Sequence, residues 1–182
     1  MEETSIIISG FGGQGTLFAG QVLAYASMDN GYDVTWIPSY GPEMRGGTAN
    51  CTVIVSEEPI GSPLVKYPDV VLALNLPSVE KYEYRVPENG ILLANSSLMN
   101  REIERKDIQS LLIPANEIAE ELGNPRLGNM IMVGAMLAVK PILSLDAVKK
   151  ALEEHIPERH KNTLPMNFKA MERGYEIAEL SV

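Results

Sequence analysis

The sequence predicts an α/β fold, a three-layer sandwich with a mostly parallel sheet, formed as a single domain by residues 1–182. Short apolar runs that are typical of strands alternate with helical patterns along the first two thirds of the chain. Residues 70–74 are fully apolar, as in a strand that is buried on both faces of a parallel sheet. With 45% apolar residues, a chain of 182 residues can bury one core but is short for two.

The first part of the chain predicts three strands and one helix. The β-branched run at residues 5–9 predicts the first strand, and residues 16–30 predict the helix that follows it. Residues 34–37 predict a second strand, which we expect Pro38 to terminate. Residues 48–56 predict a third strand, which can add an antiparallel edge to the sheet.

The rest of the chain predicts shorter strands and then a series of helices. The expected elements are strands at residues 90–94 and 111–113 and helices at residues 78–85, 116–122, 128–139, 144–154 and 165–180. The sheet is therefore expected to be complete before the last three helices begin.

The helix expected at residues 128–139 is apolar nearly all round. Gly128, Gly134, Ala135 and Ala138 are small enough to let another helix approach closely. A helix of this kind is normally buried on more than one side. We do not expect a single domain of this size to cover it, so the sequence predicts a partner surface there, or self-association of the isolated chain.

Composition excludes several classes of function. The net charge is −9 with the two signs interspersed, so we expect no nucleic-acid partner. Cys51 is the sole cysteine, which excludes an internal disulfide and an iron–sulfur cluster held by this chain alone. His155 and His160 are the only histidines and no further ligand cluster joins them, so we expect no metal site. No nucleophile has a base beside it in the sequence, and no catalytic residue is assigned.

The sequence predicts a cytoplasmic protein. The N-terminal residues MEETSIII lack the basic region that begins a signal peptide. The longest apolar stretch, residues 130–139, is shorter than the roughly 18 residues that cross a bilayer. We therefore expect no membrane partner.

The stretch SGFGGQGTLFAG places a glycine-rich loop between the first strand and the first helix. Gly10, Gly12 and Gly15 have the G-x-G-x-x-G spacing, and a helix N-terminus behind such a loop favours a phosphate. A dinucleotide site also needs an acidic residue about twenty positions on, but residues 37–39 hold none and Asp33 lies at the wrong end of the strand. The loop thus indicates a phosphate of another ligand, or glycines that only permit close packing.

A second candidate loop, SYGPEMRGG, follows the second strand. Arg45 can offer a guanidinium fork to a phosphate or carboxylate, while Tyr40 supplies a stacking face and Gly46 and Gly47 leave space. In the alternative interpretation Glu43 pairs with Arg45, and the pair is only a structural clamp. Both loops are expected at the ligand-binding edge of the sheet.

Four segments together resemble one known family. The segments GFGGQG, SYGPEMRGG, PDVVLALN and GNMIMVGAMLA are similar, in this order, to the γ subunit of 2-oxoacid:ferredoxin oxidoreductases. The resemblance covers most of the chain and implies a Rossmann-like domain. The second loop resembles the 2-oxoglutarate and branched-chain 2-oxoacid members more than the pyruvate members, and the 2-oxoglutarate enzyme is the expected one.

The resemblance implies a subunit of an enzyme that converts a 2-oxoacid, coenzyme A and oxidised ferredoxin into acyl-CoA, CO₂ and reduced ferredoxin. The implied partners are α, β and ferredoxin-like δ subunits, with ferredoxin as an indirect partner. Thiamine diphosphate and the iron–sulfur clusters would lie in those subunits, and this chain would help to bind coenzyme A and hold the thiamine-binding subunits. The candidate binding residues are Gly10, Gly12, Gly13, Gln14, Gly15, Tyr40, Glu43, Arg45, Gly46, Gly47 and Asn129.

Two other classes of function stay open on the residues alone. A freestanding Rossmann-like nucleotide-binding enzyme is disfavoured by the missing acidic residue after the second strand. A regulatory binding module would bind a ligand without an obligate partner. For Asn129, the alternative to ligand binding is a purely structural role, in which the side chain makes a hydrogen bond at the start of its helix.

Overall fold

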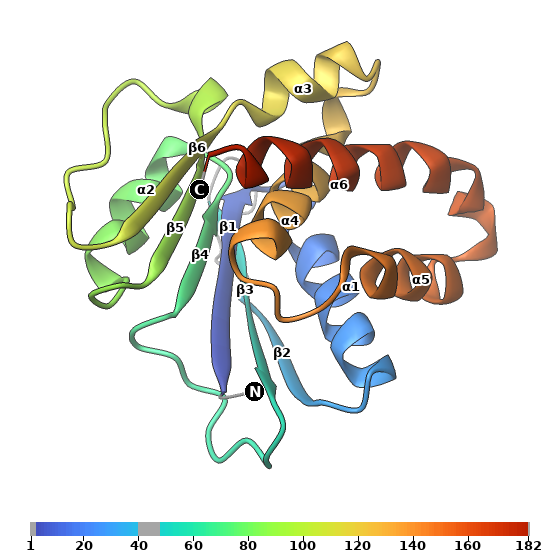
Figure 1. Cartoon of the computed structure of the whole chain (residues 1–182), viewed down its shortest axis with the longest axis horizontal. Coiled ribbons are helices and arrows are strands. Elements are labelled where there is room, and N and C mark those ends of the chain that lie inside the picture. Colours follow the sequence, from blue (N-terminus) through green and yellow to red (C-terminus); the bar gives the residue numbers. More distant parts are fainter. Residues whose placement is uncertain (1–2, 40–47, 182) are drawn as a thin grey trace.

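A computed structural model of the chain describes residues 3–39 and 48–181. It contains a six-stranded sheet in the order β2-β3-β1-β4-β5-β6 (Figure 1). The strands are β1 (Thr4–Phe11), β2 (Asp33–Ser39), β3 (Thr48–Ser56), β4 (Val70–Ala73), β5 (Ile91–Asn95) and β6 (Gln109–Ile113). β4 pairs in parallel with β1 and β5, and β5 with β6, whereas β3 is antiparallel to both β1 and β2. The predicted α/β class with a mostly parallel sheet is confirmed.

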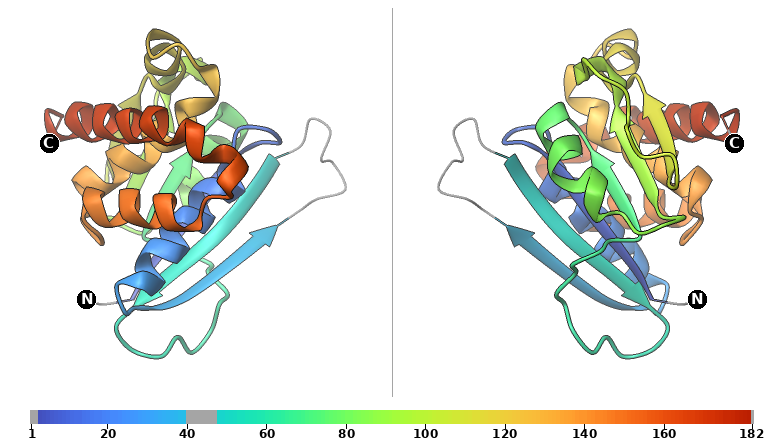
Figure 2. Two further views of the ribbon diagram at one scale, coloured as in Figure 1. Left: turned by 90° about the vertical axis from the view of Figure 1, so that its right-hand side faces the viewer. Right: turned by 90° about the vertical axis from the view of Figure 1, so that its left-hand side faces the viewer.

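Helices cover both faces of this sheet. The short helix α2 lies on one face, and α1 and α4 lie on the other with α5 and α6 packed outside them (Figures 1 and 2). The helices are α1 (Thr16–Asp29), α2 (Leu76–Tyr82), α3 (Ala115–Glu121), α4 (Gly128–Val139), α5 (Leu145–His155) and α6 (Leu164–Glu179). Short 3-10 turns lie between some of these elements: η1 (Glu83–Arg85), η2 (Ser96–Leu98), η3 (Pro125–Leu127) and η4 (Glu158–Thr163).

The strand β1 separates two apolar cores. Ile6 and Ile8 face the larger core under α1 and α4, while Ile7 faces the smaller core under α2. This alternation is the period of a strand, and it explains why the run is apolar at successive positions. β1 is thereby held at the centre of the molecule, with its carboxyl end beneath the glycine-rich loop.

Pro38 does not terminate the second strand, contrary to the sequence prediction. β2 continues to Ser39, and the Cα of Pro38 pairs with that of Cys51 on β3. β2 is an edge strand, where a residue without an N–H group can be tolerated. The expected antiparallel strand β3 lies inside the sheet, between β1 and β2, rather than at its edge.

The prediction that a single domain leaves α4 uncovered is wrong. All residues from 129 to 137 are buried, because α6 crosses α4 at very short range. A Cβ at Gly134 would lie 1.9 Å from the carbonyl oxygen of Met171, and one at Gly174 would lie 1.9 Å from that of Ile131. The chain therefore uses these small residues to bury α4 against its own last helix. Among the helices described, none combines the length and the hydropathy needed to cross a bilayer.

A buried carboxylate ties the segment before β6 to η1. The side chain of Glu83 is fully buried and accepts hydrogen bonds from the N–H groups of Glu104 (2.5 Å) and Arg105 (3.0 Å) and from the Arg101 guanidinium (2.8 Å). Burial alone would raise the pKa of Glu83, but these donors outweigh burial and hold the pKa below its usual range. The carboxylate is therefore the form that stabilises the fold.

Glu83→Gln is expected to lower the free energy of unfolding by about 2 kcal/mol at neutral pH, because the amide replaces a charged acceptor that serves three donors. A depressed pKa contributes stability above the unfolded-state pKa and loses it as the pH falls through the folded-state pKa. The difference between wild type and variant should therefore shrink on acidification, as measured by urea unfolding over a pH series. A constant difference would show that the charge of Glu83 is not the stabilising feature.

Candidate functional site

The carboxyl ends of β1, β4 and β5 lie side by side at one edge of the sheet, because these strands are parallel neighbours. From β1 the chain passes through α1 to β2 on one side, whereas β4 leads through α2 to β5 on the other side. Open α/β sheets bind ligands where the connections diverge in this way. The fold therefore places a candidate ligand site at this edge.

The glycine loop, residues 10–15, turns the chain from β1 into α1. Gly13 and Gly15 have left-handed backbone conformations, with φ of 95° and 76°, which glycine adopts without strain. Gly15 is the N-cap of α1, no side chain caps this helix, and its first turn holds no acidic residue. The first N–H groups of α1 are thus suited to an anion.

The glycines also serve close packing, which was the alternative interpretation of this loop. A Cβ at Gly10 would lie 2.6 Å from Gln14 Oε1, and one at Gly15 would lie 2.4 Å from Asn129 Nδ2. Asn129 is buried and donates to the carbonyl oxygen of Gly15 (3.1 Å). Asn129 therefore ties the start of α4 to the glycine loop, in addition to accepting a hydrogen bond from the N–H of Met130 (2.9 Å).

Gln14 closes the glycine loop and fastens it to the end of β4. Its Oε1 accepts from the Phe11 N–H (2.6 Å) and from Asn75 Nδ2 (3.3 Å), and its Nε2 donates to the carbonyl oxygen of Leu74 (3.2 Å). Both amide atoms of Gln14 thus have partners within the chain. The side chain holds the loop in place and lines the pocket beside it.

A pocket of about 200 Å³ opens beside the glycine loop, and its walls are rich in amides. Gln14, Asn95, Asn116 and Asn129 line it. Asn95, buried at the end of β5, donates to the carbonyl oxygen of Leu74 (3.2 Å) and to Asn116 Oδ1 (2.9 Å). We call this space the carboxyl-edge pocket; its other lining residues are Gly13, Leu74, Pro125, Arg126 and Gly128.

Arg126 supplies the charge of the carboxyl-edge pocket. It lies in η3, directly before α4, and is exposed. Its backbone N–H donates to Asn124 Oδ1 (3.1 Å), which fixes the turn, and none of the ion pairs between described residues includes its guanidinium. The guanidinium is thus available to an anionic ligand.

The sequence prediction included Gln14 and Asn129 but missed Asn95, Asn116 and Arg126 of this pocket. Asn95 ends the buried strand β5, and Asn75, two positions after the buried strand β4, donates to the lining residue Gln14. A polar residue at the carboxyl end of an apolar strand was the signal that could have found them. Asn116 and Arg126 have no such signal, because they reach the pocket only through the fold.

The other predicted loop lies outside the described residues, and with it Tyr40, Glu43, Arg45, Gly46 and Gly47. Its two ends are described. β2 ends at Ser39 and β3 begins at Thr48, whose Cα pairs with that of Phe11 at the start of the glycine loop. The glycine loop and the two described ends of the second loop thus lie at the same edge of the sheet.

The absence of an acidic residue after the second strand has a topological reason. In a dinucleotide-binding sheet the second strand lies beside the first and brings its carboxylate to the ribose. Here β3 lies between β1 and β2, so that the end of β2 is two strand spacings, roughly 10 Å, from β1. A carboxylate on β2 would be too far away for this role.

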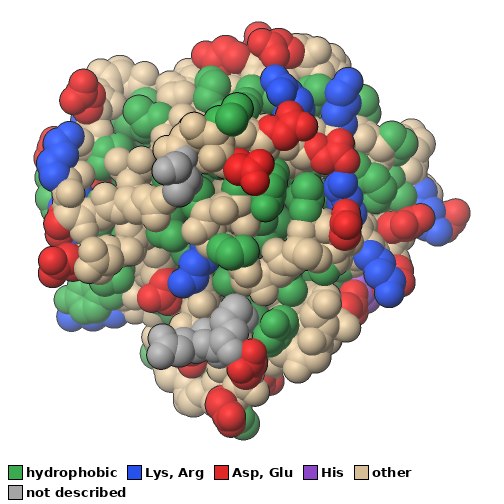
Figure 3. Space-filling model, in the orientation of Figure 1, with side chains coloured by type: hydrophobic (Ala, Val, Ile, Leu, Met, Phe, Trp, Pro, Cys, Tyr) green, Lys and Arg blue, Asp and Glu red, His purple; other side chains and the backbone are tan. Residues whose placement is uncertain are grey.

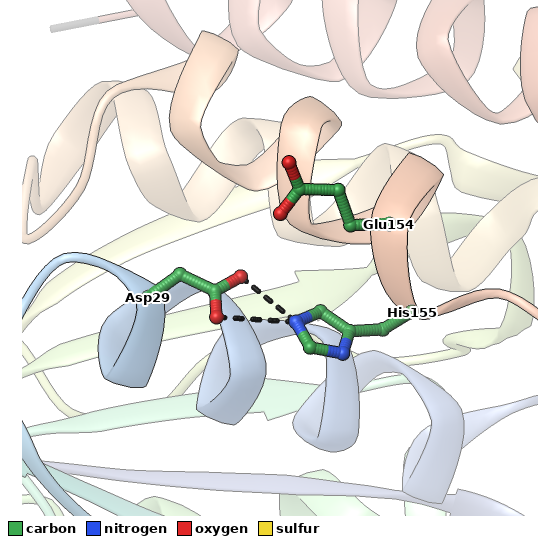
Figure 4. A group of neighbouring side chains, drawn as sticks. All are labelled: Asp29, Glu154 and His155. Carbon is green, nitrogen blue, oxygen red and sulfur yellow. Dashed lines mark hydrogen bonds and ion pairs between the residues drawn. The ribbon is translucent and has the colours of Figure 1, made fainter.

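His155 connects the ends of two helices, α5 and α1, by its contact with Asp29. Its Nε2 lies 3.1 and 2.9 Å from the two carboxylate oxygens of Asp29 at the end of α1 (Figure 4). Glu154 stands beside this pair, and the three residues offer ligand atoms within 4.8 Å of one another, all on exposed residues. Sequence reasoning missed the group because Asp29 is 126 positions from His155. The expectation of no metal site stays a prediction.

Cys51 is buried beneath α1. Its Sγ donates to the carbonyl oxygen of Thr16 (3.4 Å), and a Cβ on Gly20 would lie 2.4 Å from that sulfur. Burial raises the pKa of the Cys51 thiol to about 12. The thiolate, which is the reactive form, is therefore scarce at neutral pH.

Iodoacetamide is expected to leave Cys51 unmodified in the folded chain near neutral pH and to alkylate it fully in guanidinium chloride. The reason is that both burial and the raised pKa suppress thiolate chemistry. Mass spectrometry of the intact chain checks this result. Rapid alkylation of the folded protein would mean that the region under α1 opens readily.

The charge on the surface is mixed. On the face drawn in Figure 3, acidic and basic side chains alternate over the helices instead of gathering into a patch of one sign. Such a surface gives no steering field for a polyanion there.

A mostly parallel sheet with a glycine loop, an open helix N-terminus and an amide-lined pocket at its carboxyl edge defines a Rossmann-like domain. Residues 5–177 match the family model described as pyruvate ferredoxin/flavodoxin oxidoreductase. The chain belongs to this family.

Named relatives support the assignment. The chain is 36% identical over 181 residues to the ketoisovalerate oxidoreductase subunit VorA of Methanothermobacter thermautotrophicus, covering 99% of this chain and 37% of that protein. It is 36% identical over 178 residues to the 2-oxoglutarate synthase subunit KorC of Methanocaldococcus jannaschii, covering 96% of this chain and 93% of that protein. The crystal structure of a keto/oxoacid ferredoxin oxidoreductase γ subunit from Geobacter sulfurreducens matches with a TM-score of 0.82 and 30% identity, over 98% of this chain and 99% of that one.

The relatives differ in length. The chain spans little more than a third of the ketoisovalerate oxidoreductase subunit, but nearly all of the 2-oxoglutarate synthase subunit and of the γ subunit. This domain therefore occurs both as part of a longer polypeptide and as a protein of about this size.

Proposed function

We propose that the chain is the γ-type subunit of a multi-subunit 2-oxoacid:ferredoxin oxidoreductase, which forms acyl-CoA, CO₂ and reduced ferredoxin. The observation that carries this proposal is the match over almost the whole length of both the KorC subunit and the crystallised γ subunit. Within this class we propose 2-oxoglutarate as the substrate. Sequence identity does not favour either substrate, because it is 36% to both the 2-oxoglutarate and the ketoisovalerate relative. The choice of 2-oxoglutarate is supported by length, since the chain covers 93% of KorC but only 37% of VorA.

Partner subunits carry the redox chemistry in this proposal. A [4Fe–4S] or [2Fe–2S] cluster held by cysteines needs four thiolates. The chain has one cysteine, and its thiol is buried and protonated. We therefore assign thiamine diphosphate and the clusters to α, β and ferredoxin-like δ subunits, with ferredoxin accepting electrons from them.

We further propose that this chain contributes to the coenzyme A site. The donors at this edge of the sheet suit a pyrophosphate: side-chain amides and the guanidinium of Arg126 line the pocket, and the lining residues Gly13 and Gln14 lead directly into the N-terminus of α1, whose first N–H groups favour an anion. Coenzyme A, when bound, supplies the thiol that takes the acyl group. The proposed binding residues stay those of the two loops and α4: Gly10, Gly12, Gly13, Gln14, Gly15, Tyr40, Glu43, Arg45, Gly46, Gly47 and Asn129, with Arg126 added.

Copurification tests the subunit proposal directly. A chain tagged in its native host is expected to bring down thiamine-binding and ferredoxin-like subunits, and the complex is expected to reduce viologen with a 2-oxoacid and coenzyme A. The pure chain alone should show no such activity. Turnover by the isolated chain would instead favour a freestanding enzyme, and ligand binding without any partner would favour a regulatory module.

A further inference from the structure

A second and larger pocket, of about 440 Å³, lies on the outer side of α1. Residues of α1, α5, η4 and the first turn of α6 form its walls, and no residue lines both this pocket and the carboxyl-edge pocket. Its volume is within the range of pockets that bind small molecules, roughly 300 to 1,000 Å³. We call it the α1–α5 pocket.

Apolar side chains make up much of the wall of the α1–α5 pocket. Phe18 and Val22 come from α1, while Leu152 comes from α5 and Ile156 follows it. A fixed aromatic pair continues this wall, since the rings of Tyr25 and His155 are stacked, with centroids 4.2 Å apart and planes within 7°.

The stacked pair is held from outside the pocket. Asp29 binds the Nε2 of His155 with both carboxylate oxygens and so fixes the ring (Figure 4). This contact also joins the end of α1 to the end of α5. The wall is therefore preorganised, which lowers the entropic cost of binding a ligand against it.

The charges at this pocket have one sign. Its ionisable lining residues are Tyr25, His155, Arg159 and His160, and no carboxylate lines it, although the chain has 24 acidic and 15 basic residues. The acidic neighbour of Arg159, Glu158, pairs with Lys161 instead (2.7 Å).

Arg159 has no acidic partner among the described residues. Its Nε donates to the Nε2 of His160 (3.2 Å), and none of the ion pairs between described residues includes its guanidinium. The two terminal nitrogens of the guanidinium can therefore form a bidentate pair with a carboxylate. The amides of Gln21 and Asn167 also line the pocket and add hydrogen-bonding groups.

We propose that the α1–α5 pocket binds a small amphipathic organic acid, with its carboxylate on Arg159 and its apolar or aromatic body against the wall formed by Phe18, Val22 and Leu152. An apolar wall, a fixed aromatic pair and an unpaired cation at the rim match these two parts of the ligand. The site lies apart from the carboxyl-edge pocket, so this proposal does not depend on the coenzyme A assignment.

Calorimetric titration of the full chain with 4-phenylbutyrate and with 4-phenylbutanol tests the proposal. The two probes share an apolar body, and only the first carries a charge. We expect the acid to bind at one site about tenfold more tightly than the alcohol, because the alcohol forms no charged hydrogen bond. Backbone NMR shifts on adding the acid should centre on α1 and α5 and leave the glycine loop unchanged.

Matched variants separate the parts of the site. Arg159→Ala should weaken acid binding about tenfold and leave alcohol binding unchanged. Lys169→Ala removes an exposed positive charge of α6 outside the pocket, keeps the Glu158–Lys161 pair intact, and should change neither. Gln21→Trp, at a half-buried position in the wall, should fill the pocket and abolish binding of both probes.

Several results would overturn the proposal. They are absence of acid binding to the wild type, equal affinity for acid and alcohol, undiminished acid binding by Arg159→Ala, or NMR shifts centred on the glycine loop. Undiminished binding by a folded Gln21→Trp variant would also place the probe elsewhere. Melting curves of all three variants show whether each is folded.

Discussion

Gly134→Ala is expected to lower the free energy of unfolding by about 3 kcal/mol or more, because it forces apart two helices that touch through their backbones. The added Cβ would lie 1.9 Å from the carbonyl oxygen of Met171 and 2.7 Å from its carbonyl carbon. Both are backbone atoms, so no side chain can rotate away, and α6 itself must move. Ordinary overpacking costs roughly 1 to 3 kcal/mol, and a Cβ this close to backbone atoms exceeds that range by more than the ~1 kcal/mol that the better helix propensity of alanine offsets.

Gly128→Ala is the matched control on the same helix. The nearest atom to its added Cβ is 3.9 Å away, so the substitution makes only ordinary contacts. We expect a change of less than about 1 kcal/mol, from helix propensity alone. Urea unfolding of both variants measures the difference. Equal stability of the two variants would show that α4 and α6 do not cross as closely as described.

Gly15→Val is expected to impair both stability and the use of coenzyme A by the assembled enzyme. The residue has φ of 76°, which a β-branched side chain rarely adopts, and its Cβ would lie 2.4 Å from Asn129 Nδ2. The substitution would therefore strain the glycine loop and displace the amide that ties α4 to it. We expect a loss of about 3 kcal/mol in the free energy of unfolding, or failure to assemble.

Gly13→Val separates backbone strain from contact. Its φ is 95°, but no atom lies within 4 Å of the added Cβ. It should therefore show the cost of the left-handed conformation alone, about 1 to 2 kcal/mol. If Gly15→Val proved no more harmful than Gly13→Val, the contact between Gly15 and Asn129 would not matter to the loop.

Much of the fold could be predicted because local patterns determine it. The apolar run of β4, the helical pattern of α1 and the glycine loop between β1 and α1 all appear where the sequence predicts them. Pro38 misled the prediction, since the edge position that tolerates it follows from the pairing of β2 with β3. That pairing and the position of β3 beside β1 depend on contacts between residues far apart in the sequence, which local patterns do not predict.

The site was predicted only in part for the same reason. Glycine spacing points to residues 10–15, but Asn116 and Arg126 reach the pocket through tertiary packing. The uncovered face predicted for α4 was wrong because the chain's own α6 covers it, at Gly134 and Gly174. Small residues predict close helix approach well, but they do not say which helix approaches.

The apparent KM for coenzyme A of the assembled enzyme tests the central claim most directly. If the carboxyl-edge pocket binds the coenzyme A phosphates, Arg126→Ala should raise this KM about tenfold or more, with kcat at saturating coenzyme A and the KM for the 2-oxoacid unchanged. Lys161→Ala, which removes an exposed cation outside this pocket, should leave all three constants unchanged. An unaltered KM for coenzyme A in a fully assembled Arg126→Ala enzyme would contradict the account.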